Sequence, residues 1–511
     1  MQKNLTTLTL SASFGLSLFF TGCQTYTDQT GDMMASYKMG DLTTASASAN
    51  AAAAKNLDNK DTVLYRLEQG AILRSAALAG TPLPASELVK YQVAEGEEPL
   101  PIPSARDFYM ESSLEALLAA ETKVDEYGEG ADVKIGSELS ATLSNQANLP
   151  YRGRAYDKVL LNTYKALNYM QLGDTDSARV ELNRALLRQR EAVDENAKRI
   201  EEAQEIAEKA KSGEVEEEGE SVNYDLDKAK EDPQVSAALD GIQAELDAKI
   251  VQTYADYVNP FAVYLDGLFY LYQGVDASDT ERSRKSLERV SQMLPGNPHI
   301  AADLEAATAG VAPTNVTYVI FETGMAPWRD QFKIEIPTFI VTSSLSYVGA
   351  SFPRLKYIES YVPYIGVSTS EGTQVNTSVI ADMDSVVAKD FKNEWPSILT
   401  RTMISTATKA ALDAVVQKQV GDNFGWQAQL ATKLVTAATQ SAINIADTRT
   451  WRTLPKQYQI ARIETPADGS LSITTDLTVK NVLVEPGAIN AVYVKSISPL
   501  APLQVAQFKI K

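Results

Sequence analysis

Glu322 stands where a charged side chain is costly. It follows the apolar run Val319-Ile320-Phe321 and precedes Gly324, Pro327 and Trp328 in the stretch "FETGMAPWRD". A carboxylate at the end of a buried strand must be paired or hydrogen-bonded, because its desolvation is unfavourable. Two roles are therefore open to Glu322. It could be a catalytic acid, or it could be one half of a structural ion pair.

A second stretch, "ADTRTWRTLP", supplies a cation. Asp447, Arg449 and Trp451 alternate there, so they share one face if the chain is extended. The planar guanidinium of Arg449 can bind a carboxylate through two parallel hydrogen bonds. One interpretation is a catalytic Glu322 with Arg449 holding the substrate. We favour the other, in which Glu322 and Arg449 form an ion pair that closes a domain.

Recognisable catalytic patterns are otherwise missing from the sequence. It has one histidine, so a nucleophile with a histidine base is not indicated. Gly-x-Gly-x-x-Gly, Walker and His-Glu-x-x-His motifs do not occur. We therefore predict no catalytic residue, no metal ligand and no bound cofactor.

The elements that would position these two stretches are strands in the second half of the chain. β-branched and aromatic runs broken by Gly and Pro predict strands at 315–324, 332–341, 344–352, 456–464, 470–479 and 489–498. Between the two groups, residues 383–446 are rich in Ala, Ser and Thr and predict two helices with a turn at 424–426. We expect a C-terminal α+β domain at 311–511, with the helical pair inserted between its strands.

The first half, residues 23–310, predicts helices joined by recurring turns. Gly40-Asp41 and Gly173-Asp174 match one another, and Gly274 begins a looser third copy. A glycine can end one helix in a left-handed conformation, and an aspartate can cap the next helix. The pattern resembles the tetratricopeptide repeat, a helix-turn-helix unit. Generic α-hairpins without a repeat superhelix are the alternative.

Acidic residues gather within this helical half. Residues 191–249 hold 19 acidic and 7 basic side chains, a net charge of −12 in a chain whose total is −19. Apolar stripes on both sides of the run "GEVEEEGE" predict two long antiparallel helices at about 185–255. The acidic, glycine-containing segment 212–232 should form an exposed turn or loop at the tip of this arm.

Cys23 is the only cysteine, and it lies in "LFFTGCQTY" near the start of the sequence. A single cysteine excludes an intrachain disulfide and a metal site built from several thiolates. Lys3 precedes an uncharged apolar stretch, Leu8 to Phe20, which is too short to span a membrane. This arrangement is typical of a secretory signal.

The residues "FTGC" resemble the lipobox of bacterial lipoproteins. The resemblance implies cleavage after residue 22, with a diacylglycerol and an N-acyl chain on Cys23. Gln24 in the following position resembles an outer-membrane sorting signal, so the mature part would hang from the outer membrane, in the periplasm. An ordinary cleaved signal with a chance cysteine is the alternative.

Three further stretches carry a wider resemblance. Together with the lipobox, "NLPYRGRAYDKVLLNTYKALNYMQLGDTDSARVE", "VTYVIFETGMAPWRDQFKIEIP" and "ADTRTWRTLP" are similar to an uncharacterised family of bacterial lipoproteins with tetratricopeptide-like repeats. The resemblance implies a cell-envelope protein of this type, and it assigns no chemistry to the motifs.

We therefore expect a lipid-anchored, non-enzymatic scaffold that binds envelope proteins through its helices. The acidic charge argues against nucleic acid as a partner. The sequence is also compatible with a homo-oligomer. One alternative is an envelope enzyme that hydrolyses glycan with paired carboxylates. Another is an oligomeric outer-membrane channel or secretion component.

Overall fold

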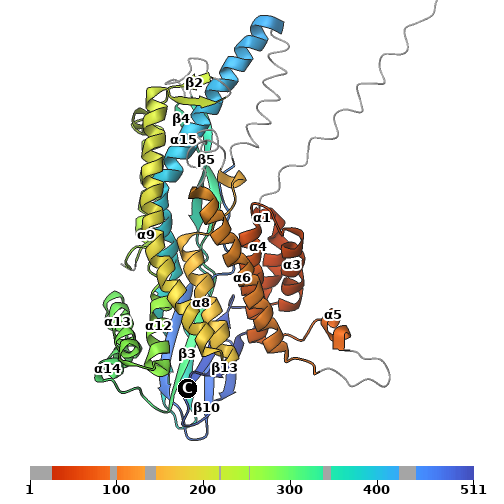
Figure 1. Cartoon of the computed structure of the whole chain (residues 1–511), viewed down its shortest axis with the longest axis vertical. Helices are drawn as coiled ribbons and strands as arrows, with labels where there is room; N and C mark the ends of the chain where they lie inside the picture. The colour runs from red at the N-terminus through yellow and green to blue at the C-terminus, as the bar shows by residue number, and fades with distance from the viewer. Residues whose placement is uncertain are drawn as a thin grey trace, which may run out of the picture.

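The computed structural model describes residues 26–91, 101–132, 146–217, 220–251, 254–337, 347–424 and 445–511. Cys23 lies outside these ranges, and so does most of the second inserted helix that the sequence predicts. The described part is elongated. β-Sheet forms one end, and long helices extend from it to the other end (Figure 1).

Helices occupy most of the first half, as predicted, and all strands other than one short hairpin lie from residue 316 onward. The helices of the first half are α1 (Tyr26–Gln29), α2 (Gly31–Met39), α3 (Leu42–Lys55), α4 (Thr62–Ala79), α5 (Ala85–Leu88), α6 (Ala105–Asp132), α8 (Ala155–Leu172), α9 (Thr175–Ser212), α10 (Leu226–Lys230), α11 (Pro233–Lys249), α12 (Pro260–Gln273), α13 (Ala277–Met293) and α14 (Pro298–Ala309). A helical N-terminal part and a sheet-rich C-terminal part confirm the α+β class.

Two of the three predicted glycine turns have the expected geometry. Gly40 and Gly173 are left-handed, with φ of 77° and 82°, and they end α2 and α8. Asp41 and Asp174 then cap α3 and α9 by accepting hydrogen bonds from the backbone N–H groups of Thr44 and Ser177.

The prediction of the same cap at Gly274 is wrong. Its φ of −64° and ψ of 136° are extended, although α12 does end there. The turn is one residue longer than the other two, since Val275 separates Gly274 from Asp276, which caps α13. The extended glycine carries the chain across this additional residue.

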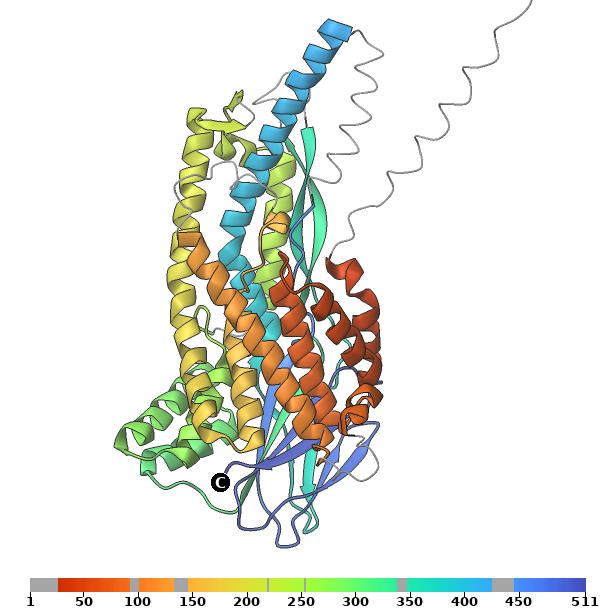
Figure 2. The same cartoon turned by 45° about the vertical axis from the view of Figure 1, so that its right-hand side comes forward.

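The acidic arm differs from the predicted pair of helices. The 38-residue α9 and the shorter α11 both pack against α15 (Met383–Phe424), a helix from the second half of the chain (Figure 2). The tip is also not a loose loop. It contains the hairpin β1 (Val215–Glu217) and β2 (Glu220–Val222), and Tyr224 and Leu226 beside it are buried. These two apolar side chains order the segment in spite of its charge.

Two sheets form the end of the molecule opposite the β1–β2 hairpin. The five-stranded sheet has the order β13-β12-β3-β9-β8, in which β12 is parallel to β3 and the other pairs are antiparallel. A four-stranded sheet has the order β11-β10-β6-β7, and β4 pairs with β5 in a separate hairpin. The strands are β3 (Val316–Thr323), β4 (Trp328–Pro337), β5 (Tyr347–Lys356), β6 (Gly366–Thr369), β7 (Gln374–Asn376), β8 (Ser378–Asp382), β9 (Gln457–Glu464), β10 (Ser470–Thr474), β11 (Val479–Leu483), β12 (Asn490–Ser496) and β13 (Gln504–Lys509).

Alternation along β3 explains how the layers stack. Val319 and Phe321 point to one face and pack in a cluster with residues of the four-stranded sheet. Tyr318 and Ile320 point to the other face and join the large core that contains the helices. Because β3 is central, its helix-facing side chains are covered by protein, and Glu322 is among them.

Among the described residues, no helix is long and apolar enough to cross a membrane.

The helix turn at Gly173 gives a stability test. A Cβ atom there would meet nothing within 4 Å, so Gly173→Ala should lower the free energy of unfolding only through left-handed strain, by about 1 kcal/mol. Gly241 lies inside α11, also in open space but without positive φ, so Gly241→Ala should raise stability by roughly 0.5–1 kcal/mol. Urea unfolding measures both, and the same sign for the two variants would contradict the turn geometry.

Candidate functional site

The predicted pair of Glu322 and Arg449 is not formed. Glu322 is fully buried and lies 2.8 Å from the ammonium group of Lys495, which stands directly opposite it on the parallel neighbour β12. The hydroxyl of Tyr493 donates a hydrogen bond to the other carboxylate oxygen. The cation that satisfies Glu322 therefore comes from the adjacent strand of its own sheet.

Helix α4 adds a second cation to this cluster. Arg74 is fully buried, and its guanidinium lies 4.5 Å from the ring centre of Tyr493 and 5.4 Å from that of Tyr164 on α8. It donates a hydrogen bond to Asn168, also on α8, at 2.6 Å. The sheet-facing sides of α4 and α8 thus meet the sheet through charge and aromatic contacts.

Burial and the two nearby cations act on the pKa of Glu322 in opposite directions. Burial alone would raise its pKa, but the charges of Lys495 and Arg74 hold the pKa below its ordinary value. Burial likewise lowers the pKa of Lys495, and Glu322 raises it above its ordinary value. Glu322 is therefore an ionised carboxylate, paired with Lys495 and with the charge of Arg74 nearby.

Arg449 is occupied by other partners. It binds Asp447 through two hydrogen bonds of 2.8 and 2.9 Å, and Asp61, just before α4, through one of 3.0 Å. Burial raises the pKa of Asp447, but Arg449 lowers it to about 2. Residues 445–450 have no regular secondary structure, so the alternation that suggested a shared face does not describe them.

The two stretches that contain these residues do lie side by side. The N–H group of Ala326 donates to the carbonyl of Leu454 at 2.9 Å, and that of Arg329 donates to the Thr450 hydroxyl at 3.2 Å. Gly324 makes the approach possible, because its φ of 66° is left-handed and a Cβ there would lie 3.0 Å from the Cβ of Lys456, directly after the second stretch.

The other residues predicted for this region, Pro327, Trp328 and Trp451, pack where the two stretches meet. Pro327 is buried directly before β4. Trp328 is half-buried, and Lys356 and Arg452 each lie 5.0 Å from its ring centre. Trp451 is buried edge-on against Tyr164, at 5.8 Å between ring centres. Each aromatic residue therefore has a packing role.

Sequence reasoning missed a third set of charges. Arg154 at the start of α8 binds both oxygens of Glu394 on α15, at 2.7 and 3.0 Å, and Arg329 of β4 binds the same carboxylate. Burial raises the pKa of Glu394, but Arg154 and Arg329 hold it far below its ordinary value. Three segments distant in sequence are joined at one carboxylate.

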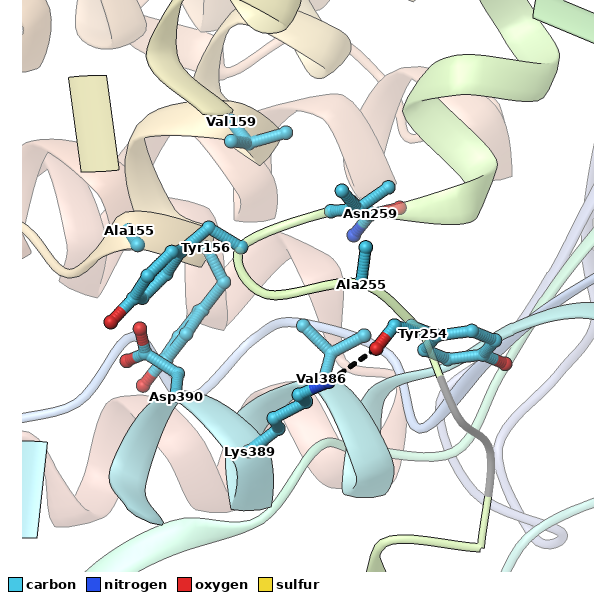
Figure 3. Close-up of a pocket in the computed structure, with 11 residues that line it drawn as sticks. Ala155, Tyr156, Val159, Tyr254, Ala255, Asn259, Val386, Lys389 and Asp390 are labelled. Carbon is cyan, nitrogen blue, oxygen red and sulfur yellow. Dashed lines mark hydrogen bonds between the residues drawn. The ribbon is translucent and has the colours of Figure 1, made fainter. Parts of the chain in front are cut away.

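A small pocket lies beside this triad, between α8, the segment before α12 and α15 (Figure 3). Its interior is only about 20 Å³, which is room for a water molecule. Asp390 and Tyr156 lie at the same end, and the buried Tyr156 hydroxyl has no hydrogen-bond partner among the described residues. Burial and the neighbouring Glu394 raise the pKa of Asp390 to about 6.

The chemistry available at these positions is limited. Within the described ranges, no group of three His, Cys, Asp or Glu side chains could hold a metal ion. Asp390 and Glu394 are one helical turn apart with pKa values shifted in opposite directions, as in acid–base pairs. However, both oxygens of Glu394 are bound to arginines, so it is not free to attack a substrate or activate water.

One sequence signal could have identified Lys495. In "INAVYVKSIS", Lys495 follows Val492-Tyr493-Val494, just as Glu322 follows an apolar run. Two strands of one sheet that end in opposite charges favour a cross-strand pair. No such signal marks Arg154, Arg329 and Glu394, because only the fold brings them together.

Comparison with protein-family models, curated proteins and solved structures gave no significant match.

The ion pair on the sheet predicts non-additive destabilisation. Glu322→Leu and Lys495→Met, made singly, should each lower the free energy of unfolding by about 3–5 kcal/mol, because each leaves a buried charge without its partner. The double variant should lose less than the sum of the two. Chemical denaturation measures all three, and additive losses would show that the two side chains do not interact.

Asp390 predicts a dependence of stability on pH. Its folded pKa of about 6 lies above the unfolded value of about 3.9, so the folded state binds this proton more tightly and loses stability as pH rises between these values. Asp390→Asn should therefore be more stable than the parent at pH 7, by on the order of 1–3 kcal/mol, and equal to it below about pH 4.

The control for that measurement is Asp240→Asn on the exposed face of α11. Thermal or urea unfolding at several pH values compares the two variants. If Asp390→Asn shows the same pH profile as the parent, the account of this carboxyl group is wrong.

Proposed function

We propose that the protein is a non-enzymatic adaptor of the cell envelope. Acyl chains on Cys23 anchor it in the outer membrane, and the mature part lies in the periplasm and binds protein partners. Its helical pairs, such as α8 and α9 with their Gly-Asp turn, act as tetratricopeptide-like units.

The observation that carries this proposal is how the conspicuous charged residues are used. Glu322 is bound by Lys495, Arg449 by Asp447 and Asp61, and Glu394 by two arginines. Their interactions hold helices, sheet and hairpin together. The stretches that looked most like a reaction centre in the sequence are thereby accounted for as a structural junction, which supports a binding function over a catalytic one.

Helix α9 is the surface that we propose for the partner. Val180, Leu187 and Val193 are 47, 50 and 51% exposed along it, among charged side chains of both signs. Apolar contacts with a charged surround are the usual composition of a protein interface. A partner with apolar side chains and a rim of both charges would match this helix.

One observation favours the enzyme alternative. The raised pKa of Asp390 in a pocket is what a general acid requires, and a glycan hydrolase would need a second free carboxylate nearby. The arginines on Glu394 count against that second role. If the alternative holds, Asp390→Asn abolishes hydrolysis of envelope glycan without loss of folding; the adaptor proposal expects no such activity in the parent.

Photo-crosslinking in cells tests the adaptor proposal. A photoreactive amino acid at Leu187 or Val193 should give discrete crosslinked products with partner proteins, whereas one at Ala301, exposed on α14, should not. In Cys23→Ser the protein should leave the membrane fraction, take up no labelled fatty acid and lose these products. Identical products from α9 and from Ala301 would contradict the assigned surface, and membrane retention of Cys23→Ser would contradict the anchor.

A further inference from the structure

The four-stranded sheet ends in an uncovered strand. Its order is β11-β10-β6-β7, so β11 is an edge, and among the described residues no strand pairs with it on its other side. Comparable edge strands are covered: β13 packs on α4 and α8, and β8 packs on α12 and α15. The main contacts of β11 are with β10. An exposed strand edge is a template on which another strand can form.

Backbone hydrogen bonds show which groups of β11 point outward. The N–H group of Val484 donates to the carbonyl of Gly469 at 2.8 Å, and that of Thr475 donates to the carbonyl of Thr478 at 2.9 Å. Successive residues of an antiparallel strand direct their N–H and C=O groups to opposite sides in turn. The even-numbered residues of β11 therefore face β10, and the odd-numbered ones face away from the sheet. These outward-facing residues are Val479, Asn481 and Leu483.

The side chains of the same three residues lie on the outer face of the sheet. Val482, between two of them, packs on the cluster that joins the two sheets, so its neighbours point to the opposite face. Val479 and Leu483 are 61 and 66% exposed. The Asn481 side chain accepts a hydrogen bond from the Ser472 hydroxyl on β10 at 2.8 Å. The edge therefore presents a polar side chain with an apolar one on each side of it.

This arrangement is self-complementary. If a second copy of β11 pairs antiparallel with the first about a two-fold axis at Asn481, each Val479 lies opposite the Leu483 of the other copy. All three outward-facing residues then fall in hydrogen-bonded pairs, and each exposed apolar side chain gains an apolar neighbour across the strands. A shift by two residues would place Val479 opposite Asn481 instead. The apolar pairing therefore selects one register.

Lys480 is compatible with this register. A lysine on an edge strand often discourages pairing. In the two-fold arrangement, however, Lys480 lies opposite Val482 of the other copy and not opposite a second lysine. Its methylene groups can then cover an apolar side chain while the ammonium group stays in water.

Charge favours a second copy at this end of the molecule. Residues 479–483 carry one charged side chain, a lysine, whereas residues 191–249 carry a net charge of −12. The four-stranded sheet lies at the end opposite the β1–β2 hairpin and the tip of α9 (Figure 1). Two copies that meet at β11 therefore keep these acidic segments apart, where salt screens their repulsion.

We infer that β11 is the interface through which two copies of this chain form a two-fold dimer, with their four-stranded sheets joined edge to edge into one continuous sheet. Each of the three facing pairs exchanges two backbone hydrogen bonds. A strand pair of this length forms a small interface, so the dimer is reversible and depends on concentration. The inference is independent of a lipid on Cys23 and of a partner on α9.

Disulfide trapping tests the register. In the full chain with Cys23→Ser, an introduced cysteine is the only thiol. Facing residues of a hydrogen-bonded pair have Cα atoms about 5.5 Å apart, within the range of about 4.4–6.8 Å that a disulfide requires. Asn481→Cys should therefore form a disulfide-linked dimer under mild oxidation. Val479→Cys alone should not, because its copy lies roughly 13 Å away along the strands. Mixed with Leu483→Cys, it should form the linked dimer.

Sedimentation measures the dimer without a crosslink, in the parent and in two variants of one position. Asn481→Pro removes an outward N–H group and no hydrogen bond to β10, so the fold should remain and dimerisation should weaken at least roughly tenfold. Asn481→Ser keeps the N–H group and should dimerise like the parent. Circular dichroism shows whether each variant is folded; if the proline variant is not, disulfide trapping decides.

Ala301→Cys, exposed on α14, measures crosslinking by random collision. If Asn481→Cys crosslinks no more than Ala301→Cys, or if the parent sediments as a monomer at every concentration tested, the inference is overturned and β11 is left for a strand of a different protein. A parent dimer that persists in folded Asn481→Pro overturns the choice of interface. Equal crosslinking of Asn481→Cys and Val479→Cys, each alone, overturns the two-fold register.

Discussion

A buried carboxylate on the central strand of the sheet sets the main constraint on this structure. Glu322 lies in the face of β3 that the helices cover, where an unpaired charge would destabilise the fold by several kcal/mol. Lys495 from the neighbouring strand and Arg74 from α4 neutralise it, and Tyr493 and Tyr164 surround the group. Because these residues come from both halves of the chain, the helices and the sheet are stable only together.

The second network extends the same arrangement along the molecule. Arg154 and Arg329 converge on Glu394, which ties the start of α8 and the hairpin strand β4 to α15. Arg449 joins its own loop to Asp61 before α4. Buried ion pairs of this kind contribute little net stability relative to apolar packing, but removal of one partner is costly. Their effect here is to fix how α15, α8 and the sheet are positioned, and so to support α9, which packs on α15.

Local patterns in the sequence were sufficient to predict helices, turns and strands, but not to predict which side chains pair across them. The apolar run before Glu322 correctly predicted a buried strand, and Gly173-Asp174 correctly predicted a helix turn. The choice of Arg449 as the partner of Glu322 failed, since it relied on an extended chain at 447–451, where Asp447 folds back onto Arg449 instead. Lys495 was the better choice, because strand pairing places it opposite Glu322.

Long-range packing explains the other differences. Nothing in the stripe of α9 or in that of α11 indicates that α15, from a part of the chain about two hundred residues away, would pack on both. The strands β6, β7, β8, β11 and β13 were also not predicted. They are short or carry mixed side chains, and the pairing that stabilises them is with strands distant in sequence.

Native-state hydrogen exchange tests most directly whether the buried charges join the helices and the sheet into one cooperative unit. If they do, the slowest amides of α4, α8, β3 and β12 will exchange with a common free energy of opening, because none of these elements can open without exposing Glu322, Lys495 or Arg74. Exchange of α4 and α8 at a clearly lower free energy than β3 and β12 would show that the helices unfold independently, and it would contradict this view of the fold.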